Sequence, residues 1–374
     1  MTPRPRRIVY VTAGLRGGGA EAMLTRLVTA RPSVADEITV VSLIPAETDI
    51  ANPHVARLRA GGVTVVELDF GRAGGVGMAT GLLRLARLIA ERRPDIVQGW
   101  MYHGDLAAMV ALAMSGRRRQ TRLVWSIRCS ALDLNRYGLG LRAVVNACTL
   151  LSRRPDLVTA NSAAGLASHL RLGYRPRRAE VTLNGIDTDE FKPDSAARRA
   201  VRIELGIPDD ALVLAHVARV DLMKDHGSFL AAMAELPELR ALLIGGGTEN
   251  LPAAANIISL GRRPDVARLS AAADFVVSSS SFGEGFSNAI AEGMACGLPA
   301  IATDVGDAAL IVGDSGLIVP PANPAALAAA IRRLAQEPAP VRAERSARAR
   351  ARIVENFAMS RAVARYAELY ASLA

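Results

Sequence analysis

The chain has 374 residues, 50% of them hydrophobic, and a formal net charge of +9. Its length exceeds the usual size of one hydrophobic core and its composition is that of a globular chain, so we expect two folded domains and exclude a disordered protein. Its three scattered cysteines, Cys129, Cys148 and Cys296, indicate a reducing compartment and exclude a disulfide framework.

No segment of the sequence approaches the roughly 20 consecutive apolar residues that a membrane-spanning helix needs. The basic N-terminus is followed by an apolar run of only about six residues, which predicts a first strand rather than a signal peptide. We therefore expect a cytoplasmic protein, either free in solution or peripheral on the inner face of the cell membrane.

The positive charge lies in the first half of the chain. Residues 1–190 hold 26 Arg against 16 acidic residues, whereas residues 191–374 hold 19 basic and 20 acidic residues. Such a one-sided excess suggests an anionic partner: a membrane leaflet, a phosphorylated lipid or a nucleic acid. The alternative is an arginine-rich genome that decorates a solvated face.

Strands alternate with helix-length segments twice along the chain. Short apolar runs occupy residues 6–14, 37–45, 63–69, 94–100, 122–128 and 155–162. After a polar stretch at 194–210, which we interpret as the joint, they recur at 211–218, 241–246, 256–261, 273–280, 298–303 and 316–321. The alternation predicts an α/β fold of two doubly wound parallel sheets, with domains at residues 1–190 and 191–355.

A glycine-rich turn follows the first strand and contains Gly17, Gly18 and Gly19. Glycines between a strand and a helix let backbone N–H groups approach a phosphate. The turn half-matches a dinucleotide fingerprint, but the second strand ends without the acidic residue that this fingerprint requires. A plain tight turn is the alternative.

Two cations follow the first strand of the second half, Arg219 and Lys224. Among 45 basic residues the chain has only two lysines, Lys192 and Lys224, so a lysine here suggests a need for a compact ammonium. With Arg219 it can neutralise a diphosphate leaving group, unless it is a solvated loop cation. A second glycine turn, Gly245–Gly246, and a loop at Arg262 are weaker candidates for backbone contact with the same ligand.

The stretch "SFGEGFSNAIAEGMACG" at 281–297 carries two glutamates among apolar residues. It predicts a loop with Glu284 and then a helix whose first-turn N–H groups belong to four residues, Gly285, Phe286, Ser287 and Asn288. Those donors and the helix dipole suit a nucleotide phosphate. Glu284 can then accept hydrogen bonds from sugar hydroxyls, and Glu292 from a ribose. A capping acid and a surface ion pair are the structural alternatives.

Taken together, Glu284-x7-Glu292, "RVDLMKD", "LNGIDTDEF", "LGRRPDV" and the first glycine loop resemble the family-four retaining glycosyltransferases of the GT-B fold. The resemblance runs from residue 17 to about residue 304. It implies two Rossmann-like domains across a cleft, with a final helix at about 356–374 packing back on the first domain. It also implies a nucleotide-sugar donor held mainly by the second domain.

The resemblance assigns roles by position. Arg219 and Lys224 bind the diphosphate, Glu284 the donor sugar, Glu292 the ribose, and Gly17–Gly18 the phosphate from the first domain. The family has a histidine near the reacting sugar, for which we choose His103, since a near-neutral imidazole can hold a hydroxyl or relay a proton. A loop histidine without function is the alternative. Acceptor contacts are expected from Trp100, Asp105 and Arg128.

The resemblance also implies that no metal or cofactor is needed. Asp187-x-Asp189 has the spacing of a metal-binding motif of another glycosyltransferase fold, but it lies in the joint, and we interpret it as structural. We expect a metal-independent hexosyltransferase that moves a sugar, with uridine as the expected base, to a lipid-linked or polysaccharide acceptor in lipopolysaccharide, glycolipid or surface-glycan synthesis. The partners are then the donor, that acceptor and an anionic membrane surface.

Three other functions stay open at this point. A nucleotide-sugar epimerase would share the fold and the nucleotide site. A nicotinamide-dependent oxidoreductase would use the first glycine loop for a dinucleotide. A nucleic-acid-binding protein would use the basic half, although only 4% of the residues are aromatic and available for stacking.

Overall fold

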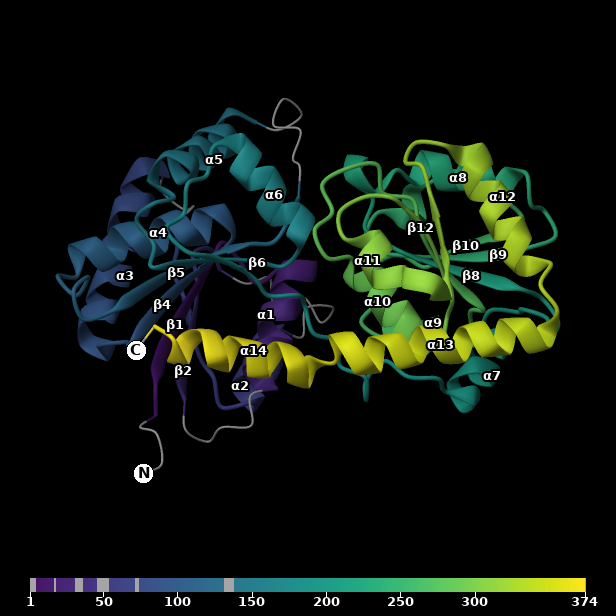
Figure 1. Ribbon diagram of the computed structural model, residues 1–374, viewed down its shortest axis with the longest axis horizontal. Coiled ribbons are helices and arrows are strands. Elements are labelled where there is room, and N and C mark those ends of the chain that lie inside the picture. Colours follow the sequence, from purple (N-terminus) through teal and green to yellow (C-terminus); the bar gives the residue numbers. More distant parts are fainter. Residues whose placement is uncertain are drawn as a thin grey trace. The chain divides into compact units, whose positions relative to one another are not determined.

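The computed structural model describes residues 5–16, 18–30, 36–45, 54–70, 74–130 and 138–373. Its contacts divide the chain into two compact units, unit 1 (Met1–Leu183 with Ala362–Ala374) and unit 2 (Asn184–Arg361). Each unit is a parallel sheet with helices on both faces (Figure 1). The first boundary precedes the expected residue 190. One reason is that Asn184 Nδ2 donates to Asn288 Oδ1 of unit 2 at 2.8 Å.

Unit 1 contains a seven-stranded sheet in the order β3-β2-β1-β4-β5-β6-β7. Its strands are β1 (Arg7–Thr12), β2 (Glu37–Ser42), β3 (Thr64–Glu67), β4 (Ile96–Trp100), β5 (Arg122–Ile127), β6 (Leu157–Ala160) and β7 (Ala179–Val181). Its helices are α1 (Gly19–Thr29), α2 (His54–Ala60), α3 (Gly74–Arg92), α4 (Met101–Met114), α5 (Leu139–Leu151) and α6 (Ala163–Leu172). Helices α3 to α6 lie on one face, while α1 and α2 lie on the other (Figure 1).

Unit 2 contains a six-stranded sheet in the order β10-β9-β8-β11-β12-β13. Its strands are β8 (Val213–Val217), β9 (Arg240–Ile244), β10 (Ile257–Ser259), β11 (Phe275–Ser278), β12 (Ala300–Thr303) and β13 (Leu317–Val319). Its helices are α7 (Ser195–Glu204), α8 (His226–Ala234), α9 (Val266–Ser270), α10 (Asn288–Ala295), α11 (Ala308–Val312), α12 (Pro324–Ala335) and α13 (Ala339–Phe357). Short 3-10 turns η2 (Leu222–Lys224), η3 (Thr248–Asn250) and η4 (Gly313–Ser315) join them.

The strands form because their apolar, often β-branched side chains are buried on both faces. Val40, Val97, Leu123, Leu214 and Leu243 are each 0% exposed, as central positions of a covered parallel sheet should be. The carboxyl ends of all strands in one sheet point to the same edge, so every strand-to-helix connection of a unit meets there.

The polar stretch that we interpreted as a joint forms helix α7 instead. Asp194 caps it, since its carboxylate accepts the N–H groups of Ala196 and Ala197 at 3.0 and 2.9 Å. Its arginines cover unit 2: Arg202 is 2% exposed and pairs with Asp274 at 3.0 Å. Charged residues therefore did not mark a linker here.

The last helix, α14 (Met359–Ala371), contributes residues from Ala362 onward to unit 1. Tyr370 donates its hydroxyl to Gln98 of β4 and lies 2.9 Å from the hydroxyl of Tyr10 in β1. Arg122 donates to the carbonyl of Leu373 at 2.7 Å. Buried hydrogen bonds thus fix this segment to the first sheet, on the face that α1 and α2 also cover (Figure 1).

Candidate active site

Each sheet has one position where the strand order reverses direction: β1 and β4 in unit 1, and β8 and β11 in unit 2. The connections that leave such a pair run to opposite faces, which opens a crevice at the carboxyl edge where ligands of α/β folds bind. In unit 2 these connections carry Lys224 and Glu284. In unit 1 they carry the first glycine loop and His103. The topology therefore places both groups of predicted residues at a switch point.

Lys224 lies on a turn that two aspartates build. Asp221 caps η2 by accepting the N–H of Met223 at 3.1 Å. Asp225 adopts a left-handed backbone conformation, with φ of 46°, and caps α8 through Ser228, whose N–H and hydroxyl donate to it at 3.1 and 2.7 Å. A non-glycine residue in this region is strained and often marks a functional turn. This turn comes directly after Lys224 and joins η2 to α8.

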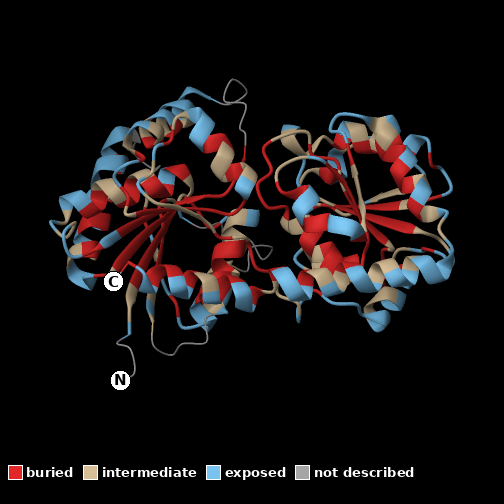
Figure 2. Cartoon of the chain, viewed as in Figure 1, coloured by how far each residue is buried: buried red, intermediate tan, exposed pale blue. Residues whose placement is uncertain are grey.

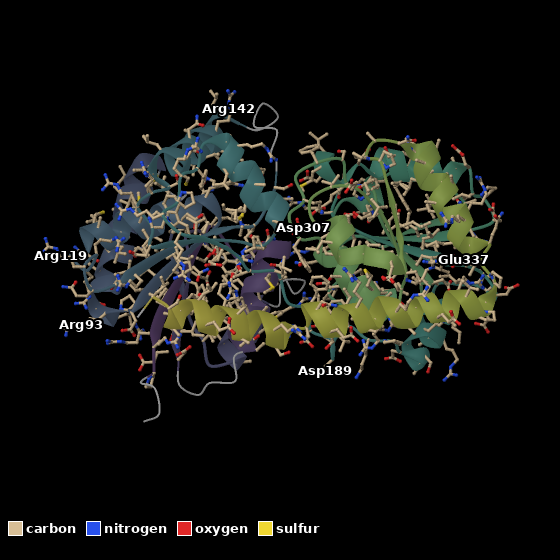
Figure 3. All side chains as sticks on the ribbon, viewed as in Figure 1. Arg93, Arg119, Arg142, Asp189, Asp307 and Glu337 are labelled. Carbon is tan, nitrogen blue, oxygen red and sulfur yellow. The ribbon has the colours of Figure 1, made fainter. Side chains whose placement is uncertain are left out.

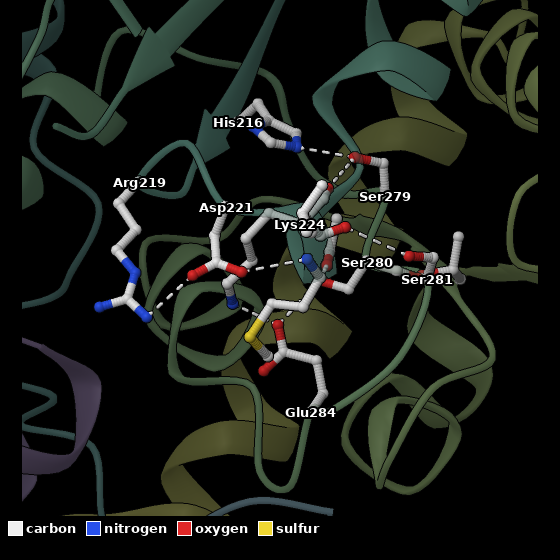
Figure 4. A network of polar contacts seen from close by, with 12 residues as sticks. His216, Arg219, Asp221, Lys224, Ser279, Ser280, Ser281 and Glu284 are labelled. Atoms are coloured by element: carbon white, nitrogen blue, oxygen red, sulfur yellow. Dashed lines mark hydrogen bonds and ion pairs between the residues drawn. The ribbon is translucent and has the colours of Figure 1, made fainter. Parts of the chain in front are cut away.

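The ammonium of Lys224 forms an ion pair with the carboxylate of Glu284, which is 8% exposed (Figure 4). The same carboxylate oxygen accepts the hydroxyl of Ser280 at 2.8 Å. Thr303 in turn donates to the carbonyl of Ser280 at 2.6 Å. We had assigned the cation and the acid to different parts of the ligand, and the structure brings them into direct contact with each other.

A buried histidine supports the lysine turn from behind. Ser279 donates its hydroxyl to the carbonyls of Lys224 and Asp225 at 2.8 and 3.1 Å, and His216 Nε2 lies 3.0 Å from that hydroxyl (Figure 4). Burial holds the pKa of His216 well below its ordinary value, so the ring is neutral. Because the serine proton is already engaged, Nε2 of His216 must be the donor to Ser279.

The helix after Glu284 begins later than predicted. Its first residue is Asn288, with Ser287 as N-cap, and the first-turn N–H groups belong to residues 288–290 rather than 285–288. Phe286 is 4% exposed and its ring lies 5.6 Å from that of Phe357, so it packs rather than binds. The extended segment before the helix lies so close to Gly306 that a Cβ there would stand 2.3 Å from the carbonyl oxygen of Glu284.

In unit 1, α4 starts directly after β4 with no intervening loop. Met101 makes the turn with a φ of 68°, a left-handed value that is rare outside glycine. His103 follows in the first turn of α4 with an exposed side chain. Partial desolvation of the ring lowers the pKa of His103, so the neutral imidazole dominates at pH 7 and can donate or accept a hydrogen bond.

Gly18 is the N-cap of α1 with an extended backbone, and a Cβ there would meet only the mobile carboxylate end of Glu21, at 2.4 Å. Its backbone N–H lies at the carboxyl end of β1, as a phosphate contact would need. Gly17 lies outside the described residues.

Comparison with known families agrees with this arrangement. Residues 17–190 match the family model described as Glycosyltransferase Family 4, and residues 211–337 match the model described as Glycosyl transferases group 1. The chain belongs to the family 4 glycosyltransferases. Both matches name sugar transfer, which favours a transferase over the epimerase and oxidoreductase alternatives.

A relative with a known activity is also a glycosyltransferase. D-inositol 3-phosphate glycosyltransferase of Mycobacterium tuberculosis is 34% identical over 158 residues, which are 38% of this chain and 32% of that protein. This match therefore spans about a third of the relative's length.

The structure is similar to HepE of Anabaena, solved in complex with UDP and glucose, with a TM-score of 0.85, 21% identity and coverage of 98% of this chain and 100% of that one. Sucrose-phosphate synthase of Thermosynechococcus elongatus has a TM-score of 0.77 and 20% identity over 98% and 99% of the two chains. At these identities the likeness establishes the fold, which is the GT-B fold that we predicted.

The glycines Gly245 and Gly246 of unit 2 allow close packing of the loop after β9. A Cβ on Gly245 would stand 2.1 Å from the carbonyl oxygen of Ala218, so only glycine lets these two loops pack against each other. Gly246 accepts the N–H of Val220 at 2.9 Å, which ties this loop to the connection carrying Arg219. Arg262, with an exposed side chain, follows β10 at the same carboxyl edge.

Arg219 has a side chain that is 64% exposed and pairs with Asp221 at 3.1 Å. Glu292 lies on the second turn of α10, four residues after Asn288, and is half-buried. Asp187, which we interpreted as structural, accepts the N–H groups of Asp189 and Glu190 at 3.2 and 3.0 Å and so shapes a turn.

Three predicted acceptor contacts do not fit the structure. Trp100 is 0% exposed and donates its indole N–H to Ala20 at 2.9 Å. Arg128 is 8% exposed, with its guanidinium carbon 3.6 Å from the Trp100 ring centroid. Asp105 is 2% exposed and accepts the N–H of Ser126 at 3.0 Å. Their place at or near strand ends suggested access to a substrate, but the immediate start of α4 and the packing of α14 bury them.

Four site residues escaped the sequence reasoning: Asp221, Ser279, Ser280 and His216. The run of four serines at 278–281 was a signal for two of them, since hydroxyls at the end of a buried strand need partners. A cavity of about 300 Å³ also exists at the opposite, amino-terminal edge of the second sheet, beside Arg198 and Asp274. Those two charges already pair at 2.7 Å, so we do not place the substrate there.

Proposed function

We propose that this glycosyltransferase transfers a sugar from a UDP-sugar to an acceptor hydroxyl with retention of anomeric configuration. The observation that carries the proposal is the placement of Lys224, Arg219 and the first turn of α10 around one switch point of the second sheet. Two cations and a helix N-terminus suit a pyrophosphate, which carries the negative charge that such groups stabilise. The complex of HepE with UDP and glucose supports uridine as the base.

The Lys224–Glu284 pair gives the site its chemistry. When a pyrophosphate enters, the ammonium exchanges the carboxylate for a phosphate oxygen. Glu284, relieved of its partner but still bound by Ser280, then accepts hydrogen bonds from hydroxyls of the donor sugar. Ser280 holds the carboxylate of Glu284 and Ser279 holds the backbone of the lysine turn before the ligand arrives, so only the ammonium has to change its partner.

The bond between the anomeric carbon and the β-phosphate oxygen breaks, and UDP leaves with its new charge met by Lys224, Arg219 and α10. The acceptor oxygen attacks the anomeric carbon from the face that UDP vacates, and its proton passes to the departing phosphate. His103, neutral at pH 7, holds a sugar hydroxyl near the reacting carbon. The charge that a divalent cation would otherwise neutralise is assigned to the arginine and the lysine, so we propose transfer without a metal or a cofactor.

For the acceptor we propose a lipid-linked or polysaccharide hydroxyl, as in the synthesis of lipopolysaccharide, glycolipid or surface glycan. The support is the excess of ten positive charges in residues 1–190, which favours an anionic surface. Such an enzyme works as a peripheral protein on the inner face of the membrane. None of the described helices combines the length and apolar composition needed to cross a bilayer.

A panel of nucleotide sugars tests the donor, because a ligand that binds only the folded protein raises its melting temperature. We expect UDP-sugars to stabilise the protein more than GDP- or ADP-sugars. Incubation of the best donor with candidate acceptors, followed by NMR of the anomeric proton, then tests transfer and retention. If no nucleotide sugar stabilises the protein, the proposal of a nucleotide-sugar donor is refuted. A product with inverted anomeric configuration would refute the retaining mechanism.

A further inference from the structure

Helix α5 presents leucines to solvent. Leu139 is 79% exposed and Leu150 is 84% exposed, while Val145 and Cys148 on the inner side are fully buried. Eleven residues separate the two leucines, about three helical turns, so they lie on the same side of the helix roughly 16 Å apart. Figure 2 shows this outer side of α5 as exposed.

Arginines accompany these leucines. Arg142 follows Leu139 by three residues in the first turn of α5, and Arg153 lies two residues beyond the last residue of the helix; both are exposed, and Arg142 points away from the sheet in Figure 3. Exposed Arg154 follows directly. The end of the next helix repeats the pattern, where Leu170 and Leu172, 40% and 42% exposed, flank an exposed arginine at position 171.

Acidic residues are nearly absent from this part of the sequence. Residues 138–179 contain seven arginines and one acid, Asp156, which pairs with Arg118 at 3.1 Å and accepts the N–H of Leu123. The fold itself does not require acidic residues to be so rare beside exposed apolar ones. In unit 2, exposed Ile203 of α7 is followed by Glu204, Asp209 and Asp210, so the same architecture there tolerates acids beside an exposed apolar residue.

We propose that the outer side of α5, with the adjoining end of α6, docks on a bilayer that contains anionic lipid. Leucines enter the interface between headgroups and acyl chains, and guanidinium groups bind the lipid phosphates. A nucleic acid fits this surface poorly, because the one aromatic residue in 138–179, Tyr174, is 1% exposed and cannot stack on bases.

The inference deepens the acceptor part of the proposed function and rests on it for why a bilayer would be the partner. Helix α5 follows β5, so its first turn lies toward the carboxyl edge of the first sheet, where substrates of α/β folds bind. Docking along this helix, about 20 Å long, therefore keeps the substrate edge of unit 1 within reach of a lipid headgroup.

Flotation of the full chain with vesicles tests the surface. The vesicles are pure phosphatidylcholine, or phosphatidylcholine with 30 mol% phosphatidylglycerol. We compare R142E/R153E and Leu150→Glu with two matched variants on unit 2, R199E/R333E and Ile203→Glu, which make the same changes at exposed positions. Binding of UDP is measured for all five proteins by calorimetry, and this readout reports on the donor site alone.

We expect the parent chain to bind the anionic vesicles and not the neutral ones, and to release them as salt is raised to 0.5 M. Each arginine near an anionic surface adds roughly fivefold in partitioning, so R142E/R153E should bind at least about 25-fold more weakly. Leu150→Glu should also weaken binding, and both unit 2 variants should stay within twofold of the parent.

Three results would each refute the proposed docking surface. They are absence of vesicle binding, equal binding to neutral and anionic vesicles, and equal losses of binding in the α5 and unit 2 variants. UDP binding that fails in the parent chain would refute the proposed donor while leaving the flotation result valid. If R142E/R153E alone loses both vesicle binding and UDP binding, that variant has a folding defect. The docking surface is then tested by Leu150→Glu against Ile203→Glu, and equal vesicle binding of these two variants would refute it.

Discussion

Opposite effects on nucleotide binding are expected from the two members of the Lys224–Glu284 pair. Lys224→Ala removes the ammonium that the pyrophosphate uses and leaves the buried carboxylate next to it. Glu284→Gln keeps the hydrogen-bonding shape but removes a negative charge from beside the phosphates. Ser280, which donates to the same carboxylate oxygen at 2.8 Å, can hold the amide oxygen of glutamine in the same way.

The magnitudes follow from the contacts. A hydrogen bond to a charged group contributes about 1.5–3 kcal/mol, so Lys224→Ala should raise the Kd for UDP roughly 10- to 150-fold. Two unit charges roughly 10 Å apart in a medium of effective dielectric about 20 interact by about 1.7 kcal/mol. Glu284→Gln should therefore bind UDP as tightly as the parent, or up to about tenfold tighter, while its kcat falls about 100-fold or more because the sugar loses its acceptor.

Calorimetric titration with UDP and a steady-state transfer assay measure the two quantities separately. Ser280→Ala is the matched control, because it weakens the hold on Glu284 and leaves both charges in place. It should lower kcat by less than Glu284→Gln and leave the Kd within about threefold. Equal losses of UDP affinity in Lys224→Ala and Glu284→Gln would refute the division of roles between phosphate and sugar.

His103→Ala should leave the Kd for UDP unchanged and lower kcat about 100-fold, as titration and a transfer assay will show, whereas an equal change in Kd would place His103 on the nucleotide. Burial raises the pKa of Asp105 to about 8 from 3.8, so the folded state binds the extra proton and stability is lost as pH rises from about 4 to about 8. Asp105→Asn should remove that loss of stability, so the melting temperature should fall less between pH 5 and pH 8 than in the parent protein. An equal fall in the variant would contradict the raised pKa of Asp105. Gly306→Ala should lower the free energy of unfolding by more than about 1 kcal/mol, since Gly306 has a φ of 65° and a Cβ there would meet the Glu284 carbonyl; urea unfolding that matches the parent would contradict this close contact.

Sequence reasoning found the charged members of the site because their residue types were unusual in their surroundings. A lysine in an arginine-rich chain and two glutamates in an apolar stretch both drew attention to the carboxyl edge of the second sheet. The two doubly wound sheets followed from the alternation of strands and helices, which local periodicity specifies strongly.

The supporting residues were missed because their roles depend on contacts across the sheet. His216 and Ser279 lie on neighbouring strands or just beyond them, and nothing in the sequence places one beside the other. The late start of α10 was missed because we counted residues 285–287 in its first turn, and Ser287 at the N-cap position makes no side-chain hydrogen bond to that turn. Trp100 and Asp105 were expected to reach the acceptor because the left-handed turn at Met101, which starts α4 at once, leaves no sequence signal.

In the proposed mechanism the pyrophosphate of the donor lies between the η2 turn and the first turn of α10. A crystal structure of the protein with bound UDP tests this placement most directly. We expect phosphate oxygens within hydrogen-bond distance of Lys224 Nζ and of backbone N–H groups at residues 288–290, with the Lys224–Glu284 ion pair opened. UDP bound at another edge of the second sheet, or bound with that ion pair intact, would contradict it.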